Sequence, residues 1–257
     1  MMGYDEMTGI IPYVDAHTHL DHYLGDEVER VMQQMEGLPC VTWAVSMEVD
    51  SWRKTQALAC NQPNILPTFG IHPWKAHLYA DRLDELDECV RESAHIGEIG
   101  LDFFWVKEQE RWPLQVTVFD YFLQRATNQQ KIVNLHTKGA EQLVLDKLRH
   151  FKVERAIVHW YSGPPDLFDA LVRYGCYFTF GVELAHSALI QELAQRCPPD
   201  KLLTETDGPG GLEWLTGERA QPTHICHVVQ KLATVRGHEI AALKAQIWEN
   251  YQRLVGE

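Results

Sequence analysis

Long apolar runs are missing from this sequence. No stretch approaches the roughly 20 apolar residues that a membrane-spanning helix needs, so we expect no membrane segment. The first residues, MMGYDEMTG, contain neither a basic n-region nor an apolar h-region, and we expect no signal peptide. The six cysteines are scattered, with no C-x-x-C pair and no disulfide-dense segment. This pattern predicts reduced, mostly packing thiols in a cytoplasmic protein.

Positive charge is also scarce. The chain has 23 Lys and Arg residues against 36 Asp and Glu residues, a formal net charge of −13. Such a chain has no overall attraction for nucleic acid or for an anionic membrane, so any phosphate must be bound locally. Metal ions in a cleft could supply that local positive charge. Broad binding of duplexes is therefore disfavoured, whereas attack on a strand end is not.

Linker-like Ser/Pro-rich stretches and blocks of like charge are lacking as well, and strand-like and helix-like segments alternate from end to end. Short apolar segments predict eight strands, at residues 13–19, 39–47, 65–73, 95–102, 131–137, 155–162, 176–184 and 201–207. Amphipathic segments predict helices at 26–37, 50–62, 78–93, 109–130, 140–151, 165–175 and 187–197, and further helical patterns follow.

This alternation favours parallel strands joined by right-handed crossovers. Eight strands permit closure into a barrel, and 257 residues is the usual size of one. An open doubly wound sheet is the rival, but it usually has fewer strands and one binding edge. We therefore expect an α/β fold, a (β/α)8 TIM barrel that allows some distortion, in a single domain over residues 1–257.

Residues that ligate metals fall at or near the ends of five predicted strands. They are His17, His19, Glu98, His136, His159 and Asp207. A parallel barrel keeps its chemistry at the carboxyl ends of its strands. Four imidazoles and two carboxylates suit one or two divalent cations such as Zn, Mn or Mg, so the pattern predicts a metallohydrolase. Each residue alone also has a structural interpretation, as a surface histidine pair, a buried salt bridge or a core histidine.

Some of these residues have more specific expected roles. Glu98 could bridge two ions held about 3.5–4 Å apart, and Asp207 could bind one ion and take a proton from water. Glu205 lies two residues earlier and is expected to orient a histidine from behind the ligands. His72 could contact the substrate or shape a turn, and Lys138 could pair with a phosphate or be solvated.

Aromatic residues also lie near the strand ends. They could stack on bases, although we expect most of them to pack in the interior: Trp74, Trp105, Trp160 and Tyr161.

Together, these motifs resemble those of the TatD family of metal-dependent deoxyribonucleases, within the amidohydrolase-like metal-dependent hydrolase superfamily. The resemblance rests on DAHTHLD (15–21), GIHPW (70–74), GEIGLDFF (97–104), LHTK (135–138), VHWYSG (158–163), TETDGP (204–209) and ENYQRLVG (249–256). It implies that the six residues above are the metal ligands and that His72 aids substrate handling. Two positions depart from the family pattern. Lys138 stands where an arginine is usual, and residues 219–222 read Arg-Ala-Gln-Pro where Arg-Asn-Glu-Pro is usual.

The leading hypothesis is a deoxyribonuclease that uses two divalent ions to hydrolyse phosphodiester bonds, at a 3′ end or in single strands. One ion would sit on His17, His19 and Asp207, and the other on His136 and His159, with Glu98 between them. Asp207, Glu98 and His72 would be catalytic, and His72 and Lys138 would bind DNA or oligonucleotide ends. The alternative is a metal-dependent amidohydrolase or esterase acting on a small molecule. A non-catalytic protein that keeps metals for structure is a third class.

Overall fold

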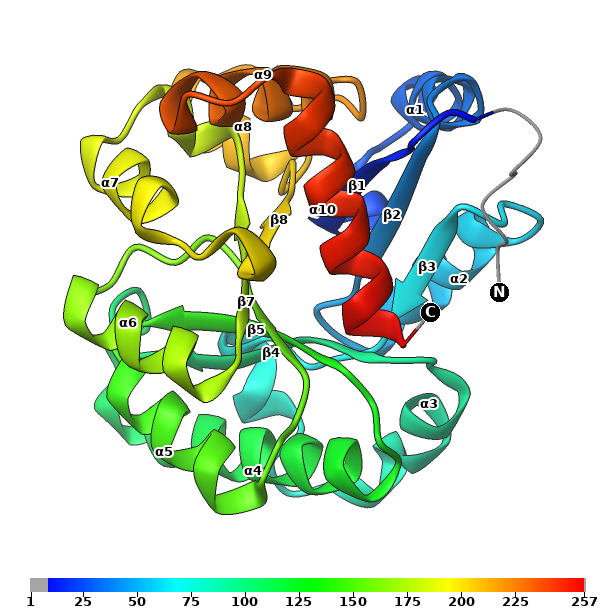
Figure 1. Ribbon diagram of the computed structural model, residues 1–257. Coiled ribbons are helices and arrows are strands. Elements are labelled where there is room, and N and C mark those ends of the chain that lie inside the picture. Colours follow the sequence, from blue (N-terminus) through cyan, green and yellow to red (C-terminus); the bar gives the residue numbers. More distant parts are fainter. Residues whose placement is uncertain (1–8, 257) are drawn as a thin grey trace. The chain divides into compact units, whose positions relative to one another are not determined.

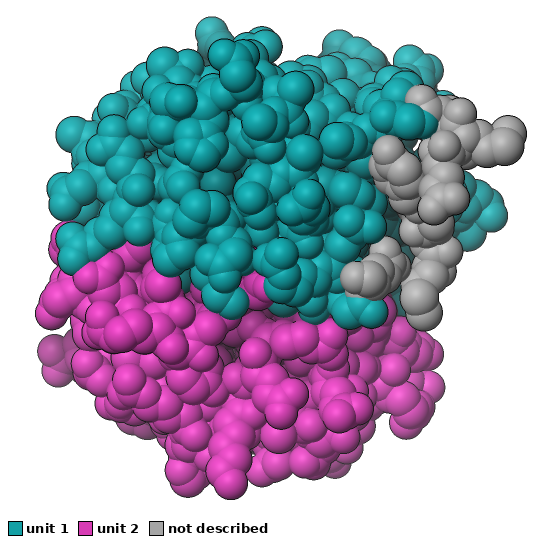
Figure 2. Space-filling model, viewed as in Figure 1, with its two compact units in different colours: residues 1–44, 55–66, 178–257 teal, residues 45–54, 67–177 magenta. Residues whose placement is uncertain are grey.

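The computed structural model describes residues 9–256, so most of the MMGYDEMTG stretch lies outside the described residues. The chain divides into two compact units, coloured separately in Figure 2. Unit 1 takes the described parts of residues 1–44, 55–66 and 178–257, and unit 2 takes residues 45–54 and 67–177. The boundary of one domain at residues 1–257 stays a prediction. Among the described helices, none is both long and apolar enough to cross a membrane.

Unit 1 contains two pairs of parallel strands. β1 (Tyr13–Thr18) pairs with β2 (Cys40–Val45), with Tyr13 opposite Cys40. β7 (Tyr177–Phe180) pairs with β8 (Leu202–Thr204), with Phe178 opposite Leu202. Just before β3 (Ile65–Thr68), the carbonyl of Asn64 accepts a hydrogen bond from the Thr42 N–H at 2.8 Å.

β1 also lies beside the segment that follows β8. The backbone N–H and the hydroxyl of Thr206 donate to the two carboxylate oxygens of the buried Asp15, at 2.8 and 2.7 Å. Burial raises the pKa of Asp15 to about 7, although the donors from Thr206 oppose this shift. Farther along, the Asp207 N–H donates to the His17 carbonyl at 3.0 Å, and the His19 N–H donates to the Gly208 carbonyl at 2.8 Å. The two segments are therefore locked together where the predicted ligands lie.

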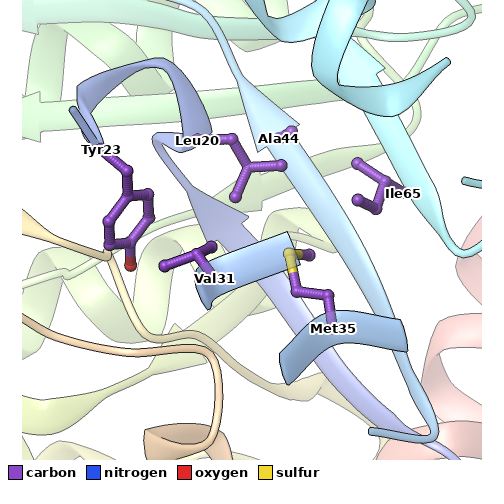
Figure 3. Packing of buried hydrophobic residues seen from close by; sticks show 6 residues of the cluster. All are labelled: Leu20, Tyr23, Val31, Met35, Ala44 and Ile65. Carbon is purple, nitrogen blue, oxygen red and sulfur yellow. The ribbon is translucent and has the colours of Figure 1, made fainter. Parts of the chain in front are cut away.

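Among the described residues, five α-helices belong wholly to unit 1. They are α1 (Asp26–Gly37), α7 (Ala188–Arg196), α8 (Gly210–Thr216), α9 (His224–Arg236) and α10 (Ile240–Val255). Val31 and Met35 on α1 are buried against Leu20, Ala44 and Ile65, as Figure 3 shows. α10, red in Figure 1, packs against β1 and β8.

Unit 2 contains three consecutive parallel strands. They are β4 (Ile96–Asp102), β5 (Val133–Lys138) and β6 (Ala156–Val158), in the order β4-β5-β6. The helices of this unit are α3 (Asp87–Glu92), α4 (Trp112–Asn128), α5 (Glu141–Phe151) and α6 (Pro165–Tyr174), while α2 (Val49–Ala59) spans a unit boundary. α4 packs on β4, and its buried Phe122 lies 5.8 Å from the ring of Phe69.

One predicted helix is wrong in extent. Residues 78–93 were expected to form a single amphipathic helix, but only Asp87–Glu92 is α-helical. Short 3-10 helices at Pro73–Leu78 and Leu83–Leu86 precede it. The apolar spacing survives, since Leu86 and Val90 are buried. The backbone nevertheless leaves helical geometry at Tyr79 and Arg82, where φ is −128° and −143°, and the segment bends there.

Candidate functional site

Unit 1 brings three of the predicted ligands together. His17 lies within β1, His19 directly follows it, and Asp207 lies in the turn after β8. The Nε2 atoms of His17 and His19 are 3.3 Å apart, and Asp207 Oδ1 lies 3.7 and 3.6 Å from them. Two ligand atoms on a tetrahedral ion at 2.0–2.1 Å are about 3.3 Å apart. The spacing and the buried histidines therefore fit one cation.

The turn that carries Asp207 is tightly specified. Asp207 has a φ of 46°, in the left-handed region that aspartate enters more readily than most residues. A Cβ on the next residue, Gly208, would lie only 2.5 Å from the hydroxyl oxygen of Tyr23, so a glycine is required there. This turn, in TETDGP, holds the Asp207 carboxylate beside the two histidines.

Unit 2 gathers a second group of donors around Glu98. Glu98 Oε1 lies 2.9 Å from His159 Nε2, 3.1 Å from His136 Nδ1 and 3.3 Å from His72 Nε2. His136 Nδ1 is also 3.4 Å from the facing ring nitrogens of His72 and His159. Three imidazoles facing one buried carboxylate oxygen are a donor set suited to a divalent cation.

The strands of unit 2 fix these side chains. Gly100 on β4 lies opposite His136 on β5, and the His159 N–H donates to the Leu135 carbonyl at 3.0 Å. Glu98 was expected near the carboxyl end of its strand, but it is the third residue of the seven in β4. The strand continues because residues 99–102 keep pairing with β5 as far as Asp102 opposite Lys138.

Asp102, the last residue of β4, was not singled out from the sequence as a candidate for the site. It is fully buried, and its Oδ2 lies 3.2 Å from His136 Nε2. The Trp74 indole N–H donates to the same oxygen at 2.6 Å. Burial acts to raise the pKa of Asp102, but the hydrogen bond and charge of His136 and the hydrogen bonds from Trp105 and Trp74 together outweigh it and lower the pKa to about 2. Its position as the last polar residue of the GEIGLD strand was the available signal.

His136 is held from both sides. Burial disfavours charge on its imidazole, but the hydrogen bonds to Asp102 and Glu98 outweigh burial and raise its pKa. When the Nε2–H of a neutral His136 donates to Asp102, Nδ1 has a lone pair that can bind a metal ion beside Glu98.

His72 and Lys138 both belong to unit 2 and have partners there. His72 is 3% exposed and caps a 3-10 helix, where its Nδ1 accepts from the Trp74 N–H at 3.2 Å. His72 therefore both caps the turn and lies beside Glu98. Lys138 is half-buried and donates to the Ser162 hydroxyl, and burial lowers the pKa of its ammonium. It is not a solvated surface charge, while its contact with phosphate stays a prediction.

Glu205 is fully buried in unit 1 and accepts a hydrogen bond from the Thr179 hydroxyl at 2.7 Å. Its expected role in orienting a histidine stays a prediction. Nearby, Glu183 was missed from the sequence. Burial, together with the charge of Glu205, raises the pKa of Glu183 to about 8. Unit 1 thus has two interacting buried carboxyl groups, and the charge of Asp207 also acts on Glu183.

Residues 219–222, where the sequence departs from the family pattern, lie in unit 1. Ala220 is fully buried, and its carbonyl accepts from the Tyr23 hydroxyl at 2.8 Å. Arg219 pairs with Glu27 and Glu213 at 3.0 and 2.8 Å. The alanine is therefore a packing position. Among the aromatic residues, Tyr161 packs in the interior as expected, whereas Trp74 and Trp105 are exposed.

Comparison with known proteins agrees with these features. A family described as TatD related DNase matches residues 14–256. A metal-dependent hydrolase of Methanocaldococcus jannaschii is 23% identical, over 93% of this chain and 95% of its own. The 3'-5' ssDNA/RNA exonuclease TatD of Escherichia fergusonii is 28% identical, over 79% of this chain and 83% of its own.

Solved structures show the same fold. The TatD homologue YJJV from Escherichia coli superposes with a TM-score of 0.81 at 22% identity, over 94% of this chain and 97% of its own. A TatD family hydrolase from Entamoeba histolytica gives 0.80 at 15% identity, over 95% and 97% of the two chains. These likenesses confirm the α/β barrel class predicted from the sequence. Because the family match spans almost every described residue, the chain belongs to the TatD-related family of metal-dependent hydrolases.

Proposed function

We propose that this protein is a two-metal phosphodiester hydrolase that acts on DNA, at a 3′ end or in single-stranded form. The observation that carries the proposal is the group of imidazole nitrogens facing Glu98 Oε1 at 2.9–3.3 Å in unit 2. A relative at 28% identity that is named as a single-stranded DNA and RNA exonuclease supports a nucleic acid as the substrate.

The buried donors divide into two sets. In this proposal, His17, His19 and Asp207 hold one divalent ion, and Glu98, His136 and His159 hold another. Zn, Mn and Mg all suit such a mixture of nitrogen and oxygen donors. Bound divalent ions supply Lewis acidity at phosphoryl oxygens and lower the pKa of water. The bridging role expected of Glu98 stays a prediction.

Proton positions within unit 2 assign different tasks to two histidines. His136 donates from Nε2 to Asp102, which leaves Nδ1 available as a ligand. His72 accepts the Trp74 N–H at Nδ1, so a neutral His72 carries its proton on Nε2. That proton can be donated to a phosphate oxygen, which fits substrate handling better than metal ligation.

Asp207 supplies the group that can accept a proton. Its side chain is 18% exposed, more than those of His17 and His19, so water can reach the carboxylate. A carboxylate within reach of an attacking water is a general base. Lys138 and His72 would then hold the phosphate of the substrate. Such local donors are needed because the net charge of the protein is −13.

The test is cleavage of end-labelled single- and double-stranded oligonucleotides by metal-reconstituted protein, with Glu98→Gln as the matched variant. We expect the wild-type protein to shorten the oligonucleotide when metal is present. Glu98→Gln should lose activity by orders of magnitude, because the side chain keeps its shape but loses its charge. A panel of esters and amides runs alongside. Turnover of that panel with intact oligonucleotides would favour the small-molecule hydrolase, and normal cleavage by Glu98→Gln would make Glu98 structural.

A further inference from the structure

Three large aromatic side chains of unit 2 are exposed around one buried carboxylate. Trp74, Phe104 and Trp105 are 46%, 48% and 48% exposed. A single exposed aromatic residue is ordinary, and Trp214 on α8 is 67% exposed. A group of them at one place indicates a binding surface.

Asp102 anchors all three residues. Its Oδ2 accepts from the Trp74 indole N–H at 2.6 Å. Its Oδ1 accepts from the backbone N–H groups of Phe104 and Trp105, at 3.0 and 2.7 Å. Since Asp102 is fully buried and accepts all three of these bonds, it holds the loop after β4 in a fixed conformation. The aromatic surface is thus pre-organised.

The same carboxylate joins this surface to the candidate metal ligands of unit 2. Asp102 Oδ2 lies 3.2 Å from His136 Nε2. The ring of His72 meets the ring of Trp74 edge to face, with centroids 4.8 Å apart. A ligand lying on the aromatic side chains would therefore lie next to the His72 and His136 side of the site.

Positive charge accompanies the aromatic rings. Lys107 Nζ lies 4.6 Å from the centroid of the Phe104 ring, and Lys138 Nζ lies 5.8 Å from it. The edge of Trp105 also meets Phe104, with centroids 4.9 Å apart. Proteins that bind single-stranded nucleic acids combine aromatic faces with positive charge, so that bases stack on the rings and phosphates pair with the cations.

We infer that Trp74, Phe104 and Trp105 form a stacking platform for unpaired bases of a single-stranded nucleic acid, an inference that rests on the proposed function. The faces of bases inside a duplex are covered by their neighbours, so the platform favours unpaired bases, whose faces are free. Stacking is tolerant of sequence because every base has an aromatic face. The platform therefore selects unpaired ends without selecting a base sequence.

The test is a binding cycle on metal-loaded full-length protein. The two probes are a short oligothymidylate with non-cleavable linkages and the same strand with abasic residues at its 3′ end. Dissociation constants are measured by fluorescence anisotropy for the wild type, Phe104→Ala and Trp105→Ala. Trp105→Tyr is the conservative variant, and Trp214→Ala is the control on another exposed tryptophan. Trp74 is left intact because its indole also holds Asp102.

We expect Trp105→Ala and Phe104→Ala to weaken binding of the base-bearing strand, each by about 5- to 100-fold. Wild-type protein should lose at least this factor on the abasic strand, and each alanine variant should prefer the base-bearing strand less than the wild type does. Trp105→Tyr should restore the preference for bases, and Trp214→Ala should behave as wild type.

Equal binding of both strands by the wild type would overturn the platform, as would unchanged binding by both alanine variants. If oligonucleotides are still cleaved, the proposed function stands without the platform. If base-dependent binding is seen but no oligonucleotide is cleaved, the platform stands and the proposed nuclease activity does not. Failure to bind any oligonucleotide would overturn both.

Discussion

At the scale of single residues, tautomers decide what each histidine of unit 2 can do. His136 and His72 lie 4.6 Å apart by ring centroid, yet their fixed hydrogen bonds are opposite. His136 uses Nε2 to face Asp102, whereas His72 uses Nδ1 to accept the Trp74 N–H. A neutral His136 that donates from Nε2 therefore has a lone pair on Nδ1 for a metal ion, whereas a neutral His72 has its proton on Nε2. Neither difference follows from residue identity, because both residues are histidines at strand ends in the sequence.

Lys138 allows a prediction at this scale. If it contacts phosphate, Lys138→Ala should raise the KM for an oligonucleotide by about 10- to 100-fold, the usual value of a hydrogen bond to a charged group. Lys138→Arg should retain or improve binding, because a guanidinium can meet a phosphate with two parallel bonds. Steady-state kinetics measure both variants, with the exposed Lys54→Ala as control. A KM for Lys138→Ala equal to that of wild type would leave Lys138 with a packing role against Phe104 and Ser162.

Glu183 allows a second prediction, on stability. Its pKa is about 8 in the folded protein and 4.5 ordinarily, so the folded state holds the proton more tightly than the unfolded state. The stabilising effect is full below pH 4.5 and is lost as pH rises toward 8. Glu183→Gln keeps an oxygen for the Gly181 N–H, which Glu183 Oε1 accepts at 2.9 Å, but it cannot ionise.

The melting temperature of metal-free Glu183→Gln should therefore exceed that of wild type by a margin that grows between pH 5 and pH 8. Thermal denaturation followed by circular dichroism measures the margin, and the exposed Glu110→Gln should show none. A margin that does not change with pH would mean that Glu183 is already ionised in the folded protein.

At the scale of elements, the sequence predicts strand identity better than strand length. Each predicted strand coincides with an observed one, although β5 runs one residue past its predicted end, because runs of β-branched residues such as those in KIVNLHT mark buried strands. The lengths differ since pairing partners, which a single sequence does not show, end a strand. β4 ends at Asp102, as predicted, because β5 runs beside it as far as Lys138, and Glu98 is the third of its seven residues.

Gly100 tests how closely β4 and β5 must approach. It has a φ of 148°, and a Cβ there would lie 1.9 Å from the carbonyl oxygen of His136. Gly100→Ala should therefore destabilise the fold by about 3 kcal/mol or more, since backbone must move to make room. Urea denaturation measures the loss. Gly37→Ala at the end of α1 is the matched control, because nothing lies within 4 Å of its Cβ position and its effect should be small. Similar midpoints for the two variants would contradict the close approach.

At the scale of the whole molecule, charge separates this protein from those that bind nucleic acid by a basic surface. Its net charge is −13, and the cations near the Phe104 ring are Lys107 and Lys138. Affinity for a nucleic acid then has to come from bound metals, from a few local donors and from stacking. Of these, stacking does not depend on salt through counterion release, whereas contacts with phosphate do.

That division predicts a shallow dependence of binding on salt. Each phosphate neutralised on a single strand contributes a slope of about −0.7 to the plot of log affinity against log salt concentration. Two or three phosphate contacts therefore give a slope of about −1.4 to −2.1. The measurement uses the non-cleavable oligothymidylate with saturating metal, and Lys138→Ala should reduce the slope by about one phosphate's share. Trp105→Ala should lower the affinity at every salt concentration and leave the slope unchanged, because it removes stacking without removing charge. A much steeper slope for the wild type would mean that a row of basic residues, rather than a few donors and the metals, holds the strand.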